Sequence, residues 1–127
     1  MAQVWDYTTD ILVVGSGGGG MVAALAASDL ECKALVIEKG SVYGGSTAMS
    51  GGAMWVPNNH LMKREGIQDS TEEGLAYLKA ITGGKVSEDR LRAYVEAGPV
   101  VVKWLEEHSH ARYSVVHGSS DFYTEAP

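Results

Sequence analysis

Two short runs of consecutive apolar residues mark the N-terminal part of the chain. The first closes the segment 8–14 with Ile-Leu-Val-Val, and the second is Ala34–Ile37. Neither run alternates apolar with polar positions, so each predicts a strand that is covered on both faces. The small apolar residues 21–27 between them predict a compact helix that lies close to the sheet. The pattern predicts a β-α-β unit, and the fold class is therefore α/β.

Polar caps and glycines divide the rest of the chain into helices. The sequence Pro-Asn-Asn at 57–59 predicts a helix start, followed by a helix over 60–64. Ser70 and Glu73 have the spacing of a capping box and predict the start of another helix. That helix is expected to end at Gly83, and its apolar face consists of Leu75, Leu78 and Ile81.

A third helical segment is predicted from Ser87, a typical N-cap residue. Gly98-Pro99 is expected to break or kink it, because proline removes a backbone donor. A further helix then ends near His108, and residues 112–116 are predicted to form a short strand. The buried face of the segment before the proline is expected to contain Leu91, Tyr94 and Val95.

The composition excludes several classes of protein. With 127 residues, 45% of them hydrophobic, the chain is one ordinary globular domain at most. It has no run of roughly 18 apolar residues and no signal-peptide pattern, so a cytoplasmic location is expected. Acidic residues outnumber basic ones by 16 to 10, which argues against nucleic acid as the main partner. The single cysteine, Cys32, cannot form an internal disulfide.

Glycine, present 16 times, is concentrated in a few clusters. Gly15, Gly17 and Gly20 follow the first strand and match the dinucleotide fingerprint G-x-G-x-x-G. They permit a tight turn, close backbone approach to a pyrophosphate, and close packing of helix on strand. Glu38, at the end of the second strand, is placed to accept hydrogen bonds from ribose hydroxyls. Its charge disfavours NADP, although Lys39 leaves that cofactor open, and a glycine-rich turn in another βαβ fold is the alternative.

A second glycine-rich segment, 40–52, follows where a plain NAD domain continues into a helix. It is rich in serine and threonine, so it can place backbone N–H and hydroxyl donors along an extended ligand. The alternative is a solvated loop between two elements.

These residues carry a family resemblance. The motifs G-S-G-G-G-G at 15–20, V-I-E-K-G at 36–40 and G-G-S-T-A-M-S-G-G-A-M-W-V-P-N-N at 44–59 resemble the FAD-binding segment of the fumarate reductase and 3-ketosteroid dehydrogenase flavoprotein superfamily. The last motif is most similar to the 3-ketosteroid Δ1-dehydrogenase branch. The resemblance implies a Rossmann-like FAD-binding βαβ unit with a flavin-contacting loop over 1–56. Residues 57–127 would then be a helical segment leading toward the substrate domain, and the domain would be incomplete.

The resemblance also implies which residues bind the cofactor. The turn and Glu38 would hold the ADP half of FAD, and the second glycine segment would line the pyrophosphate, ribitol and flavin ring. No histidine lies between Gly40 and Asn59, so non-covalent FAD is expected. The expected cofactor-binding residues are Gly15, Ser16, Gly17, Gly18, Gly19, Gly20, Glu38, Lys39, Gly45, Ser46, Thr47, Ser50, Gly51 and Gly52.

An aromatic pair near the C-terminus is the candidate catalytic element. In the Δ1-dehydrogenase branch a tyrosine of such a pair, after an aspartate, lies in the steroid pocket. Here Phe122 stands at that place and Tyr123 follows it. Phe122 is the candidate substrate-binding residue, and Tyr123 is the candidate base if the pair is shifted by one position. The alternative is that both side chains are packing residues.

The resulting hypothesis is an FAD-dependent dehydrogenase that acts on a CH–CH group next to a carbonyl, such as a 3-ketosteroid. One alternative is a fumarate- or urocanate-type reductase, and another is a non-catalytic nucleotide-binding fragment or subunit. Family members are several times longer, so we expect the rest of the enzyme or a second chain to complete the FAD site, and this chain alone to be inactive. His108 and His110 lack a third ligand nearby, so no metal site is predicted.

Overall fold

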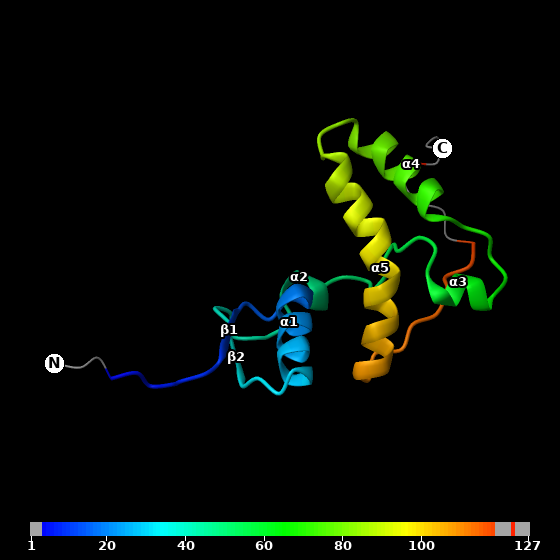
Figure 1. The fold of residues 1–127 in the computed structure, drawn as a ribbon. Helices are drawn as coiled ribbons and strands as arrows, with labels where there is room; N and C mark the ends of the chain where they lie inside the picture. Colours follow the sequence, from blue (N-terminus) through cyan, green and yellow to red (C-terminus); the bar gives the residue numbers. More distant parts are fainter. Residues whose placement is uncertain (1–3, 119–122, 124–127) are drawn as a thin grey trace. The chain divides into compact units, whose positions relative to one another are not determined.

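The structure is a computed structural model that describes residues 4–118 and residue 123 (Figure 1). The chain divides into two compact units, Met1–Met54 and Trp55–Pro127. The first contains the two strands with α1 (Gly18–Asp29), and the second contains the helices that follow residue 55, and each unit is described by itself below.

The first unit is built on two parallel strands joined by a helix. Strand β1 (Ile11–Val14) pairs with β2 (Ala34–Ile37) in the register Ile11 to Ala34 and Val14 to Ile37. Helix α1 (Gly18–Asp29) connects them and packs against both strands (Figure 1). The predicted β-α-β unit and the α/β class are therefore confirmed. The first strand is shorter than the predicted segment 8–14, and the helix begins three residues before residue 21, inside the glycine turn.

The sheet is covered less fully than its apolar strands predict. Val13 is buried beneath α1, but Leu12, Val14 and Ile37 are exposed. Side chains alternate between the two faces of a strand, and α1 is the one described helix that packs on this sheet. The expectation that both faces are covered is wrong for the described part of the chain, because a single helix covers a single face.

A short helix, α2 (Gly45–Ala48), interrupts the second glycine-rich segment, for which only an irregular path was expected. Gly44 precedes it with φ of 106°, a left-handed conformation that glycine adopts without strain. A Cβ at Gly44 would lie 2.5 Å from the Cβ of Ala48. Glycine is therefore required here both for the backbone angle and for space.

The second unit contains α3 (His60–Arg64), α4 (Thr71–Thr82) and α5 (Glu88–His108). The predicted caps are largely confirmed. The Asn59 side chain accepts the N–H groups of Leu61 and Met62, and Ser70 accepts the N–H of Glu73 at 3.1 Å. Gly83 ends α4 with φ of 54°. Ser87 is the N-cap of α5, as predicted, but its side chain makes no capping hydrogen bond.

Helix α5 continues through Pro99, where a break or kink was expected. Val95 and Val102 lie on the two sides of the proline, and both are buried. These residues are two turns apart, so one helical face anchors both halves and offsets the lost backbone hydrogen bond. The helix of 21 residues replaces the two that the sequence predicts.

Two further expectations for the second unit are wrong. Tyr94 is 46% exposed rather than buried, because its hydroxyl is directed to the backbone oxygen of Trp55 at 2.5 Å. The expected strand 112–116 is absent, since residues 111–116 have no regular structure. In the described part of the chain no helix is long and apolar enough to cross a membrane.

The core of the second unit lies between α4 and α5, which form a helical hairpin (Figure 1). Leu75, Leu91 and Val95 are buried together, and Leu78 and Val86 pack around them. Gly74 belongs to the same contact, because a Cβ there would lie 2.6 Å from the ring of Pro57.

Shortening a buried side chain of α5 tests the packing of this core. Val95→Ala removes buried methyl groups and should lower the free energy of unfolding by about 2 kcal/mol. Val100→Ala, on the exposed side of the same helix, is the matched control and should change it by less than about 0.5 kcal/mol. Urea unfolding followed by circular dichroism measures both values, and equal losses would contradict the assigned packing.

Candidate functional site

A glycine turn joins β1 to α1 and forms the centre of the site. Gly15 has φ of 92°, and its N–H donates to the backbone oxygen of Ile37 at 2.7 Å. A Cβ at Gly20 would lie 2.0 Å from the oxygen of Gly15, so no other residue fits at this position. The expected roles of Gly15 in the turn and of Gly20 in close packing agree with this geometry.

The outer side of the same turn is open. A Cβ built at Gly15, Gly17 or Gly19 would meet no atom within 4 Å. Gly17 is the N-cap of α1 and has no side chain to cap the first N–H groups of the helix. Open space at the N-terminus of a helix is the arrangement that accepts a phosphate group.

Ser16 and Glu38 connect the turn to the end of β2. Ser16 is 3% exposed. Its N–H and hydroxyl both donate to one oxygen of Glu38, at 2.9 and 2.6 Å. The other Glu38 oxygen accepts the N–H of Gly40 at 2.9 Å. Ser16 also accepts the N–H of Gly44 at 2.9 Å, so the same pair fixes the entry to α2.

These hydrogen bonds stabilise the charged form of Glu38. The Ser16 hydroxyl contributes most, followed by the N–H groups of Gly40 and Ser16, and the pKa of Glu38 falls to about 2. The carboxylate is therefore ionised at neutral pH. A charged carboxylate attracts hydroxyl donors and repels a phosphate, which agrees with the expected ribose contact.

Helix α2 lies against the N-terminus of α1. The hydroxyl oxygen of Thr47 accepts the N–H of Gly18 at 3.0 Å. A Cβ at Gly45 would lie 3.3 Å from the Cα of Gly17, so the two glycine segments are in close contact. The Gly18 N–H is thus already bonded to Thr47, whereas the sequence grouped it with the phosphate donors. Thr47 keeps its hydroxyl hydrogen for another acceptor.

The remaining predicted cofactor residues lie along the same segment. Lys39 and Ser46 are exposed. Ser50 donates to the backbone oxygen of Thr47 at 2.8 Å and accepts the N–H of Gly52 at 3.1 Å. A Cβ at Gly51 or Gly52 would meet no atom within 4 Å. The structure thus brings most of the predicted residues together in the first unit. No described contact there defines a role for Lys39 or Gly51.

The candidate catalytic pair lies elsewhere in the chain. Tyr123 is 57% exposed and belongs to the second unit. Phe122 lies outside the described residues. No described hydrogen bond orients the Tyr123 hydroxyl, so its role as base stays a prediction.

The histidines occupy sites that the sequence did not predict. His60 is partly buried and pairs with Glu106 at 2.6 Å. Glu106 also accepts the N–H of Tyr113, and that bond and His60 hold its pKa below the usual value. His117 pairs with Glu65 at 2.6 Å. No group of three or more histidine, cysteine or acidic residues in the described part of the chain is placed to hold a metal ion.

Two structural contributions have no clear signal in the sequence. Gly44 has a left-handed backbone angle and donates its N–H to Ser16, and its position in a glycine pair is the only sign of that role. The His60–Glu106 pair joins α3 to α5 across 46 positions in sequence. Spacing does not reveal such a contact, because it depends on how the helices pack.

A glycine turn between a strand and a helix, with an ionised acid after the next strand, defines a nucleotide-binding α/β protein. The chain matches the family described as FAD binding domain over residues 10–125, and it belongs to that family. Its cofactor is therefore FAD. The open turn, the Glu38 carboxylate and the open glycines of the second segment fit that cofactor.

Several relatives of established name are similar to the chain. It is 44% identical over 118 residues to 3-oxosteroid 1-dehydrogenase of Mycolicibacterium smegmatis, which is 93% of this chain and 21% of that protein. It is 40% identical over 97 residues to urocanate reductase of Eggerthella lenta, which is 76% of this chain and 16% of the relative.

A solved structure of a steroid dehydrogenase is also similar to the chain. The crystal structure of 3-ketosteroid Δ1-dehydrogenase from Sterolibacterium denitrificans in complex with 1,4-androstadiene-3,17-dione superposes with a TM-score of 0.85 and 47% identity. The match covers 94% of this chain and 21% of that one. The chain thus spans about a fifth of the length of the relatives that it matches.

Substitution in the glycine turn should separate packing from open space. Gly20→Ala places a Cβ against a backbone oxygen and is expected to destabilise the first unit by more than about 3 kcal/mol. In Gly19→Ala the added Cβ contacts no other atom, and alanine favours a helix. This substitution should therefore raise the free energy of unfolding of the first unit by about 0.5–1 kcal/mol. Denaturant unfolding of the FAD-free protein measures both, and equal effects would contradict the geometry.

The Glu38 pKa can be measured directly. The carboxyl carbon of Glu38 should titrate by NMR with a midpoint near pH 2. Because the folded pKa is lowered, the stabilisation is complete above about pH 4.5 and is lost as the pH falls toward 2. Ser16→Ala removes the largest contribution and should move the midpoint upward. A wild-type midpoint near 4.5 would contradict the assigned hydrogen bonds.

Proposed function

We propose that this chain forms the FAD-binding portion of a dehydrogenase that acts on the CH–CH group next to a ketone, with a 3-oxosteroid as substrate. The observation that carries the proposal is the match to a steroid-bound 3-ketosteroid Δ1-dehydrogenase at 47% identity and a TM-score of 0.85. The match covers 94% of this chain.

The residues of the first unit bind and orient the cofactor in this proposal. The N–H groups of the turn at Gly17 and Gly19 face the pyrophosphate, and Glu38 accepts the ribose hydroxyls. Thr47 donates its hydroxyl hydrogen to the cofactor while its oxygen holds Gly18. Ser46, Ser50, Gly51 and Gly52 line the ribitol and the ring. Bound FAD supplies a hydride acceptor.

The remaining chemistry requires a proton acceptor. A ketone acidifies the neighbouring C–H, and we assign Tyr123 to remove that proton. Phe122 would pack against the substrate. The exposure of Tyr123 supports this role, because a base must be reachable by substrate.

A reductase of the urocanate type is the second candidate, and the 40% identity to urocanate reductase supports it. Carboxylate substrates call for paired cationic clamps. Reduction of urocanate in place of steroid oxidation would favour this candidate.

Several finer assignments belong to the same proposal. FAD is held non-covalently, consistent with the absence of histidine between Gly40 and Asn59. Residues 1–56 bind FAD, residues 57–127 lead toward the substrate region, and further residues, in this protein or in a second chain, complete the site. A cytoplasmic location stays a prediction.

The test uses purified protein that carries this chain. It should be yellow, release FAD on acid precipitation, and oxidise 4-androstene-3,17-dione with an artificial electron acceptor. Tyr123→Phe should lower kcat at least about 100-fold with unchanged FAD content, whereas Tyr113→Phe should have little effect. Flavin that remains on the precipitated protein would refute non-covalent binding, and full activity of Tyr123→Phe would refute the assigned base.

A further inference from the structure

A pocket of about 550 Å³ lies in the second unit, beside the start of α5. Its lining comes from the segment before α3, from α4, from the turn into α5, and from the first two turns of α5 itself. None of the residues assigned above to FAD or to proton transfer takes part. The volume is within the range of small-molecule sites, about 300–1,000 Å³.

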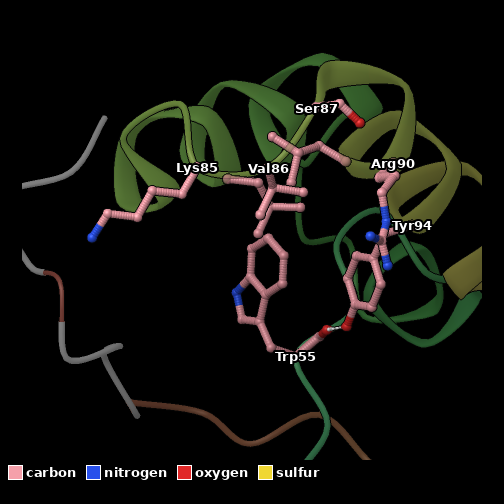
Figure 2. A pocket seen from close by; sticks show the side chains of 8 residues that line it. Trp55, Lys85, Val86, Ser87, Arg90 and Tyr94 are labelled. Carbon is pink, nitrogen blue, oxygen red and sulfur yellow. Dashed lines mark hydrogen bonds between the residues drawn. The ribbon is translucent and has the colours of Figure 1, made fainter.

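Aromatic rings form one wall of the pocket. The Trp55 and Tyr94 rings are nearly parallel, at 5°, with centroids 6.4 Å apart, and Tyr77 supports Trp55 from a centroid distance of 5.0 Å. The Tyr94 hydroxyl donates to the backbone oxygen of Trp55, which Figure 2 shows as a dashed line. Burial raises the pKa of Tyr94, so this donor stays protonated. The wall is therefore fixed, yet Trp55 remains 41% exposed.

The polar side of the pocket is cationic. Arg90 lies beside the Tyr94 ring and Lys85 extends outward from the rim (Figure 2). No acidic residue lines the pocket. Within the described residues neither cation makes an ion pair, whereas Arg92, on the same helix, contacts Glu72, Glu88 and Glu96.

The nearby acids do not neutralise these two cations. Glu88 pairs with Lys79 at 2.8 Å and also contacts Arg92. The Ser87 hydroxyl makes no capping bond. The site therefore combines a stacking surface with positive charge that makes no ion pair among the described residues.

We propose that this pocket binds a small molecule that has a flat apolar ring system and one anionic group. The ring stacks on Trp55 and contacts Val86, and the anionic group pairs with Arg90 and Lys85. Stacking on an aromatic face stabilises the binding of any flat ring, whereas the two cations favour an anionic ligand over a neutral one. This site is independent of the proposed dehydrogenase activity.

The experiment titrates the full chain with 2-naphthoate and follows the indole N–H signals by NMR. Trp5→Phe and Trp104→Phe assign the three tryptophan signals. The Trp55 signal should shift and saturate, while the other two stay in place. A neutral analogue, 2-naphthalenemethanol, should bind about tenfold more weakly, the loss expected for one charge-assisted contact.

Charge variants give the decisive comparison. Arg90→Gln combined with Lys85→Gln should weaken 2-naphthoate binding about tenfold or more. Lys103→Gln, an exposed cation of α5 outside the pocket, is the matched control and should leave binding unchanged. These substitutions are at the surface, so the fold is retained, and the Trp55 signal of the free variant confirms this.

Any of three results with the naphthalene probes would overturn the proposal: no shift of Trp55 with 2-naphthoate, equal binding of the neutral analogue, or equal binding by the double variant. Neutral 4-androstene-3,17-dione is added as a separate probe. If it shifts Trp55 as strongly as 2-naphthoate, the pocket recognises apolar rings alone and the anion site is refuted. If the protein binds 2-naphthoate as expected but does not oxidise the steroid, that result would instead count against the dehydrogenase assignment.

Discussion

The contact between Ser16 and Glu38 organises the first unit of the chain. A carboxylate with the pKa lowered to about 2 accepts three hydrogen bonds from two different segments. The serine oxygen also receives the N–H of Gly44. The end of β1, the end of β2 and the entry to α2 therefore meet at one side-chain pair. The turn can remain rich in glycine, and therefore open to a ligand, because the hydrogen bonds of Ser16 with Glu38 and Gly44 hold its position.

The two glycine segments serve this arrangement in different ways. In the first, Gly20 is required by packing and Gly17 leaves open space, although both belong to one motif. In the second, Gly44 sets the backbone direction and Gly45 allows α2 to approach the turn. As a result Thr47 provides the hydrogen bond to α1 that Gly17, lacking a side chain, does not. The same few contacts thus stabilise the turn locally and, in the proposed function, position the residues that bind FAD.

The second unit has an apolar core between α4 and α5 and a cluster of aromatic rings at the edge of that core. Val95 and Leu75 close the interior of the helical hairpin, and the same helix presents Tyr94 to Trp55. Because Pro99 lies between two buried valines, the long helix is held by tertiary packing. The break expected at this proline follows from local rules, and those rules do not include the anchoring of both halves.

Local sequence patterns were sufficient to predict the β-α-β unit, most helix starts and the placement of the glycine turn. These depend on local properties: apolar runs, capping side chains such as Asn59 and Ser70, and residues that tolerate unusual backbone angles. The resemblance carried by the glycine motifs also led to the FAD family. The three-dimensional structure was needed to establish which strand residues are exposed, that α5 is continuous, that Gly18 is bonded to Thr47, and that His60 pairs with Glu106. Each of these involves groups far apart in sequence, and their energies depend on packing, which no local pattern encodes.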